Sequence, residues 1–198
     1  MDFKNHIVLA WNLTLKHIVS LVLMTLVMMG ISIVTLGILA PVTMAGYMQA
    51  ILILIRTGRE PKIQDIFAQM RLFLPLLAFS IGVFIIISLG LMMFLLPGMI
   101  IALGVAFCCI YMIPLMTDRG LGIFDAIKES FRMATTGLIA ENVVVVIIFW
   151  VITMIGSSVF IGFLFTQPLA TLFLMSVYDE KVKLSSTTIQ NNLLKSNE

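Results

Sequence analysis

Few residues of this sequence combine a chemically active side chain with a spacing that would let it act. Asp65 and Asp125 could serve as a pair of carboxylates in acid–base catalysis, and His6 and His17 are the two histidines of the chain. Both aspartates, however, open amphipathic segments, where a negative charge in the first turn stabilises the helix dipole. The histidines are distant in sequence from any cluster of acids. We therefore interpret all four side chains as structural.

The sequence contains none of the motifs of common enzyme classes. No P-loop, HExxH or GxSxG pattern occurs, and no pair of carboxylates lies within an apolar segment. Cys108 and Cys109 are adjacent, so they cannot easily bridge each other and do not have the spacing of metal ligands. The fifteen methionines are scattered through apolar segments, as is typical of packing residues. We predict a protein that is not an enzyme, with no catalytic residue, metal or cofactor.

Polar side chains within the apolar segments could line a path for a solute. Gln49 and Gln167 lie at comparable depths of two predicted helices, and with Tyr47 and Tyr111 they form a candidate intramembrane polar cavity. The other interpretation is that such glutamines hydrogen-bond across helices. None of the four is charged, which argues against a proton- or sodium-driven pump.

Composition defines the class of protein. Apolar residues make up 61% of the chain and charged residues 11%, whereas a soluble domain has about 25% charged residues. The mean hydropathy is +1.14. These values predict an integral membrane protein with one domain over residues 1–178. A net charge of +2 without a basic–aromatic patch argues against nucleic acid as a partner.

Six apolar segments are long enough to cross a hydrocarbon core of about 30 Å. The first is too long for the roughly 7–15 apolar residues of a cleaved signal peptide, so we expect it to be retained. The fold class predicted is all-α, a polytopic membrane helical bundle of six transmembrane helices. These helices pair as three hairpins with uncharged tips: 18–35 with 40–55, 72–96 with 99–116, and 138–155 with 159–178.

An amphipathic segment precedes each hairpin. Apolar residues recur at helical spacing in 3–11, 63–74 and 123–134, with polar or charged residues between them. We expect short interfacial helices along the headgroup boundary, and connecting helices packed on the end of the bundle are the other interpretation. Segment 179–198 is polar, and we expect a disordered cytoplasmic tail.

The three units recur at a spacing of roughly sixty residues, which indicates a threefold internal repeat. Asp65 recurs as Asp125, and Gly30 recurs as Gly90. The prolines near the hairpin tips do not share this spacing. We therefore predict a structural repeat and leave open whether the units descend from one ancestor.

Small residues follow one another at helical spacing in several predicted spans. Gly98, Ala102 and Ala106 form one such stripe, and Gly46 with Ala50 forms another. Small side chains let helix backbones approach closely in lipid. The stripes indicate packing between helices of this chain or an interface with another subunit.

The distribution of positive charge predicts the orientation. All twelve Lys and Arg residues lie at the N-terminus, in two charged islands or in the tail, and none lies in a hairpin tip. The positive-inside rule then places both termini in the cytoplasm. Because guanidinium groups bind phosphate in a bidentate manner, the Arg56–Arg59 turn is the best candidate for a specific contact. The islands supply a candidate collar for anionic lipid headgroups: Arg56, Arg59, Lys62, Arg71, Arg119, Lys128 and Arg132.

Two stretches carry a resemblance to a known group of proteins. The first is Ala-Pro-Val-Thr-Met-Ala-Gly at 40–46 with the charged turn at 56–61, and the second is 114–119 with 125–130. They resemble bacterial inner-membrane proteins of the YciC type and the membrane domain attached to some glycerophosphodiesterases. The resemblance implies a six-helix domain of an uncharacterised family in the bacterial inner membrane. It implies no catalytic residue, since the phosphodiesterase chemistry of that group belongs to a soluble domain.

Together these features predict a non-enzymatic inner-membrane protein with an envelope or assembly role. Its expected partners are anionic lipid headgroups on the cytoplasmic side, other membrane proteins or a second copy of itself. The alternative is a passive channel or small-solute transporter. Solute flux into liposomes that contain the purified protein distinguishes the two functions.

Overall fold

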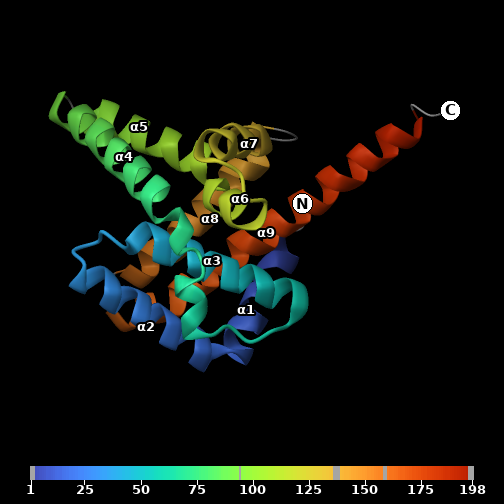
Figure 1. Cartoon of the computed structure of the whole chain (residues 1–198), viewed down its shortest axis with the longest axis horizontal. Coiled ribbons are helices and arrows are strands. Elements are labelled where there is room, and N and C mark those ends of the chain that lie inside the picture. Colours follow the sequence, from blue (N-terminus) through green and yellow to red (C-terminus); the bar gives the residue numbers. More distant parts are fainter. Residues whose placement is uncertain (1–2, 94, 136–138, 158–159, 196–198) are drawn as a thin grey trace.

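Helices make up the secondary structure of the residues that the computed structural model describes, which are 3–93, 95–135, 139–157 and 160–195 (Figure 1). No strand occurs among them. Two short 3₁₀ helices, η1 (Ile63–Phe67) and η2 (Met70–Leu72), interrupt the α-helices. The α-helices are α1 (Phe3–Lys16), α2 (Ile18–Val34), α3 (Ala40–Thr57), α4 (Phe73–Met93), α5 (Leu95–Cys109), α6 (Met112–Asp118), α7 (Ile123–Thr135), α8 (Ile139–Ser157) and α9 (Phe160–Lys195).

Several helices are long and apolar enough to cross a membrane. Within the described residues three segments qualify alone, namely Ala40–Thr57, Ile63–Met92 and Gly98–Asp118. The number rises to five when two bent pairs, α1 with α2 and α7 with α8, each count as one span. The prediction of an all-α chain with several helices of transmembrane length is confirmed at this level. The described helices establish three to five segments of transmembrane length, and they do not establish six separate spans or a threefold repeat.

The turn between α2 and α3 lies where the sequence predicts it. Gly37 has a φ of 83°, a left-handed conformation that glycine adopts without a steric penalty. Pro41 lies in the first turn of α3, where its missing N–H is not needed. At the other end Gly58 has a φ of 71° and donates its N–H to the Leu54 carbonyl at 2.9 Å. Glycine and proline therefore define both ends of α3.

The second hairpin turns earlier than predicted. The sequence predicts a break at Pro97 and Gly98, but both residues lie inside α5, which begins at Leu95. A proline in the first helical turn costs no hydrogen bond, which explains why the helix tolerates it. Gly98 instead allows close packing, since a Cβ atom built on Gly90 would lie 3.0 Å from the Gly98 Cα. The interpretation of Gly98 as a packing residue between helices of this chain is confirmed.

Segment 63–74 is not the amphipathic α-helix that its pattern predicts. It forms η1 and η2, and Ile66 is fully buried whereas Phe67 and Leu74 are exposed. In a 3₁₀ helix residues i and i+3 eclipse each other, so an α-helical stripe cannot form. The segment is held against α3 at Gly46, where a Cβ atom would overlap the Ile66 carbonyl. The close contact with α3 thus accounts for the departure.

Helix α1 does not lie across the end of the bundle as a surface helix would. Its Trp11 ring packs edge-to-face on Phe165 with 5.6 Å between centroids, and His6 contacts Ser176 further along α9. Two contacts at separated points of α9 mean that α1 runs alongside that helix. Trp11, which the sequence assigns to the apolar face, is half exposed, and His6 lies on the buried face instead.

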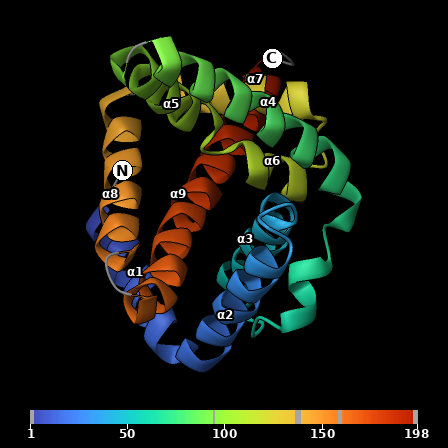
Figure 2. The same ribbon diagram turned by 90° about the vertical axis from the view of Figure 1, so that its left-hand side faces the viewer.

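Helix α9 forms the centre of the molecule. Figure 2 shows it between α8 on one side and α2 and α3 on the other, and these helices contact it. Every residue from Ala170 to Asp179 is buried. The prediction of a disordered tail is wrong as far as Lys195, where α9 ends after projecting from the rest of the molecule (Figure 1). A polar segment can extend a helix that is already formed because it does not have to nucleate a new one.

Apolar side chains also cover the outside of the molecule. Only 6% of an apolar 18-residue stretch within Ile63–Met92 is buried. Helices α4 and α5 project together from the remaining helices (Figure 1). Phe84 on α4, Ile100 on α5 and Trp150 on α8 are all exposed. A soluble monomer rarely exposes such a large apolar surface. The exposed faces are suited to contact with lipid.

Candidate functional site

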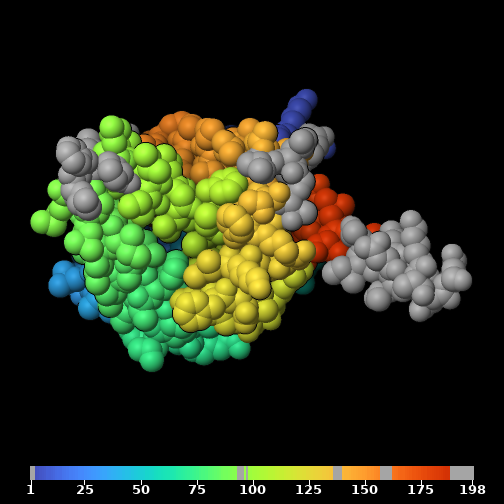
Figure 3. All heavy atoms as spheres, turned by 90° about the horizontal axis from the view of Figure 1, so that it is seen from above, coloured from blue at the N-terminus to red at the C-terminus, as the bar shows by residue number. Residues whose placement is uncertain are grey.

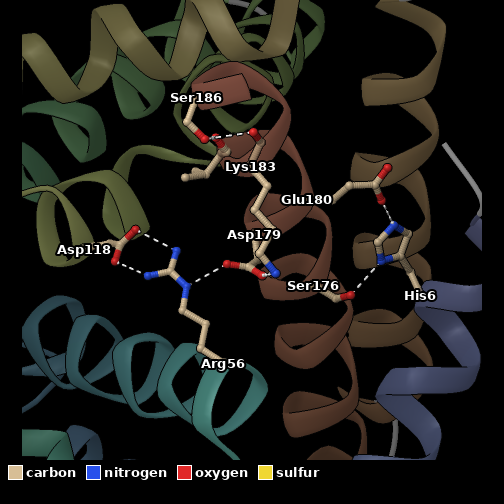
Figure 4. A network of polar contacts seen from close by, with 9 residues as sticks. His6, Arg56, Asp118, Ser176, Asp179, Glu180, Lys183 and Ser186 are labelled. Atoms are coloured by element: carbon tan, nitrogen blue, oxygen red, sulfur yellow. Dashed lines mark hydrogen bonds and ion pairs between the residues drawn. The ribbon is translucent and has the colours of Figure 1, made fainter. Parts of the chain in front are cut away.

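A short stretch of α9, residues 176–183, makes polar contacts with four other helices, α1, α3, α6 and α7. Figure 4 shows that α9 faces α1 on one side and Arg56 and Asp118 on the other. We call this cluster the α9 junction. Its members are His6, Arg56, Tyr111, Asp118, Ser176, Tyr178, Asp179, Glu180, Lys181 and Lys183.

Arg56 lies at the centre of the α9 junction and binds two carboxylates. Its Nη1 and Nη2 donate to the two oxygens of Asp118 at 2.6 and 3.0 Å, and its Nε donates to Asp179 Oδ1 at 2.6 Å (Figure 4). Lys183 approaches the second oxygen of Asp179 at 2.6 Å. The side chains of Asp118 and Asp179 are only 14% and 7% exposed. Two cations thus balance two nearly buried carboxylates where α3, α6 and α9 meet.

This environment changes the pKa of Asp179. Burial raises the pKa of the carboxyl, but hydrogen bonds from Lys183 and Arg56 outweigh that effect and hold it below its ordinary value. Because all three guanidinium nitrogens of Arg56 donate to carboxylates, they are not directed at an external phosphate. The predicted Arg56–Arg59 phosphate site is therefore not preformed.

Two tyrosines extend the α9 junction toward α7 and α8. The Tyr178 hydroxyl donates to Asp118 Oδ2 at 3.1 Å, and the Tyr178 ring lies 6.3 Å from the ring of Tyr111. Tyr111 donates to the Asn142 carboxamide oxygen at 3.2 Å, and Asn142 in turn donates to the Ala134 carbonyl at 2.7 Å. Hydrogen bonds thus join α9 to α6 through Tyr178, and join Tyr111 to α8 and the end of α7, while the two tyrosine rings lie beside each other between these two sets.

Lys181 anchors the last turn of α7. Its ammonium donates to the Met133 carbonyl at 2.9 Å and lies 5.5 Å from the centre of the Tyr111 ring. A cation beside the C-terminal carbonyls of a helix interacts favourably with the helix dipole. Burial lowers the pKa of Lys181, although Glu141 and Glu180 oppose this shift. The sequence placed Lys181 in a flexible tail, so its pattern gave no signal for this contact.

Each histidine faces one glutamate. His6 Nδ1 lies 2.6 Å from the Ser176 hydroxyl, and its Nε2 lies 2.5 Å from Glu180 Oε2 (Figure 4). His17 Nδ1 lies 4.0 Å from Glu60, a distance at which attraction depends on the charge of the ring. The two contacts attach both ends of α1 to other segments, α9 and the loop after α3.

The seven collar residues do not converge on one point. Arg59 binds Asp65 at 2.8 Å, so Asp65 has a local basic partner. Arg132 binds Glu129 at 2.6 Å and Arg119 lies 3.7 Å from the same carboxylate. The hydrogen bond from Arg132 lowers the pKa of Glu129. Within the described residues, the exposed collar cations that form no ion pair are Lys62, Arg71 and Lys128.

The four residues of the candidate polar cavity make separate contacts. Tyr47 pairs with the Thr25 hydroxyl at 3.0 Å, and Gln167 lies 3.6 Å from the sulfur of Met44. Tyr111 belongs to the α9 junction described above. Gln49 carries a buried carboxamide oxygen without a hydrogen-bond partner among the described residues. These contacts favour hydrogen bonding between helices over a shared cavity, with Gln49 as the exception.

The α9 junction is the cluster of polar contacts that sequence reasoning missed. Arg56 is separated from its two carboxylate partners by 62 and 123 residues, so neither pair follows from local spacing. The available signal was the recurrence of polar turns at the ends of three apolar units, which places Asp118 and Asp179 in corresponding positions. No family model matches the chain, and neither a curated protein nor a solved structure matches it.

Proposed function

We propose that the protein is a multi-pass membrane protein with six spans in three hairpins and with both termini in the cytoplasm. The exposed apolar faces of α4, α5 and α8 support an environment of lipid. The absence of Lys and Arg from the predicted hairpin tips supports this orientation. The resemblance to YciC-type proteins supports, as part of the proposal, a bacterial inner membrane and descent from that family.

The function that we propose is non-enzymatic binding of anionic lipid headgroups at the cytoplasmic face, in an envelope or assembly role. The observation that carries it is the set of collar cations Lys62, Arg71 and Lys128, which are exposed and form no ion pair with the described residues, while the other collar residues bind acids. A basic side chain near an anionic leaflet contributes about 1 kcal/mol of attraction. Three such side chains therefore favour anionic over neutral lipid.

Mass spectrometry of lipids that copurify from native membranes tests this function. Replacement of Lys62 and Lys128 by Gln should reduce bound anionic lipid relative to neutral lipid. The matched control is Lys4→Gln with Lys195→Gln, which removes the same charge from the two ends of the chain. If both double variants lose anionic lipid equally, the collar has no specific role and the proposal fails.

A passive channel is the second candidate, and the orphan oxygen of Gln49 favours it. A buried carboxamide oxygen without a partner is costly unless water or a solute reaches it. Reproducible solute flux through liposomes, abolished by Gln49→Leu and retained in Gln167→Leu, would support this candidate. The absence of flux in the unmodified protein would exclude it under the conditions used.

A further inference from the structure

Besides its buried face, helix α7 has exposed aromatic side chains and exposed charged side chains. Ala126, Ser130 and Ala134 are fully buried against neighbouring helices. Phe124 and Phe131 lie about two turns apart and hence on one side of the helix, and they are 84% and 50% exposed. Because the packing of α7 uses its other face, the two phenylalanine rings are not needed to hold the helix in place.

Charged side chains lie along the edge of this aromatic face. Lys128 follows Phe124 by about one turn and is exposed. On α7 and in the turn before it there are three basic side chains, Arg119, Lys128 and Arg132, and two acidic ones, Asp125 and Glu129, so the net charge is positive. The helix therefore presents exposed aromatic rings next to an excess of positive charge.

The direction of α7 relative to α8 bears on where this face would lie in a membrane. Its axis makes an angle of 110° with α8, whose Ile147, Val151 and Ile155 are exposed apolar side chains. If α8 crosses the bilayer, α7 must lie close to the membrane plane. Figure 3 shows α7 in yellow on the outside of the molecule, with its outer surface open.

We propose that α7 is a membrane-surface helix whose Phe124 and Phe131 insert below the headgroups while Lys128 contacts anionic headgroups. This inference rests on the proposed function, because it requires α8 to cross the bilayer. Amphipathic helices that combine an apolar aromatic surface with basic side chains bind membranes in this position. Lipid is the occupant that the geometry favours, since the chain continues from this helix into an apolar one that lipid would surround.

Tryptophan fluorescence with brominated lipids tests the inference in the full-length protein. Phe124→Trp is introduced together with Trp11→Phe and Trp150→Phe, and the protein is reconstituted into vesicles. Lipids brominated near the headgroups should quench the fluorescence of a tryptophan at position 124 more strongly than lipids brominated deep in the acyl chains. Phe131→Trp in the same background provides a second reporter if the first variant does not fold.

The natural Trp150 on α8 supplies the control for membrane placement. A variant with Trp11→Phe alone retains Trp150, which should be quenched by bromine deep in the acyl chains. If Trp150 is not quenched by any brominated lipid, the transmembrane placement itself is wrong. If Trp150 is quenched and the tryptophan at 124 is not, the inference about α7 fails while the placement of α8 stands.

The basic edge is tested by varying the lipid charge. Quenching at position 124 should increase when anionic lipid replaces neutral lipid, and Lys128→Glu should reduce that increase. Lys195→Glu, at the far end of α9, should leave it unchanged. If the emission of the tryptophan at position 124 changes with the protein-to-lipid ratio but not with bromination of the lipid, this face of α7 contacts a second copy of the protein. That result would overturn the proposal.

Discussion

At the scale of single residues, loss of Arg56 should destabilise the protein, because Arg56 binds two nearly buried carboxylates. Removal of one partner from a buried ion pair commonly costs about 3–5 kcal/mol, because the other charge remains buried. Arg56 is itself 33% exposed, so we expect a smaller loss of roughly 1–3 kcal/mol for Arg56→Gln. Thermal unfolding in detergent measures the effect.

The control for this prediction is Lys183→Gln. Lys183 also binds Asp179, but its side chain is 72% exposed, so water replaces much of its contribution. We expect its loss to cost less than about 1 kcal/mol. Equal destabilisation by the two variants would show that Arg56 is not the centre of the α9 junction.

Asp179 should make stability depend on pH. Its pKa is lower in the folded protein than in the unfolded chain, so its contribution is present in full above the ordinary aspartate pKa of about 3.9. The contribution is lost as the pH falls through the folded pKa. The difference in stability between the unmodified protein and Asp179→Asn should therefore shrink on acidification below about pH 4. A difference that stays constant between neutral and strongly acidic pH would contradict this assignment.

The residue-scale features of the site were only partly predictable from the sequence. The excess of positive charge in the islands identified Arg56 and Lys128, but charge alone cannot show which cations are neutralised. Arg56 is neutralised by carboxylates distant in sequence, whereas Lys128 forms no ion pair in the described part of the chain. Long-range pairing is decided by how helices pack, which periodicity does not encode.

At the scale of elements, the contact between α3 and η1 depends on Gly46. A Cβ atom there would overlap the Ile66 carbonyl, so Gly46→Ala should force α3 and η1 apart. Overpacking of this kind costs about 1–3 kcal/mol. Gly30→Ala is the matched control, since no atom lies within 4 Å of its added Cβ and alanine is the better helix former. Thermal unfolding should separate the two variants, and equal stability would argue against the close contact.

Element prediction succeeded where local chemistry decides the outcome. Gly58 ended α3 and Gly37 lies in the turn after α2 as expected, and both glycines adopt left-handed backbone conformations. It failed at segment 63–74, where the approach of η1 to α3 replaced an amphipathic helix by 3₁₀ turns. Apolar spacing describes a helix in isolation and cannot include a backbone contact with a neighbouring helix.

At the scale of the whole molecule, α9 connects the parts of the chain. Its buried portion packs between α8 and the α2–α3 hairpin, and its junction residues bind α1, α3, α6 and α7. The polar contacts lie in one stretch of α9, close to its projecting end, while the apolar faces of α4 and α5 extend away (Figure 1). This separation of charged and apolar regions is the arrangement that a membrane protein requires, because ion pairs favour the water-facing end of a bundle.

The orientation of the whole chain can be tested by labelling single cysteines in a Cys108→Ser, Cys109→Ser background. Cysteines at Gly37, Leu96 and Ser157 lie at the predicted hairpin tips and should react with an impermeant thiol reagent from the periplasmic side. Cysteines at Thr57, Gly120 and Ser186 adjoin the charged islands or lie on the projecting end of α9, and should react only after the membrane is opened. The positive-inside rule requires this pattern because all twelve Lys and Arg residues lie outside the hairpin tips. Labelling in the reverse pattern would invert the orientation, and a mixed pattern would reject the six-span arrangement.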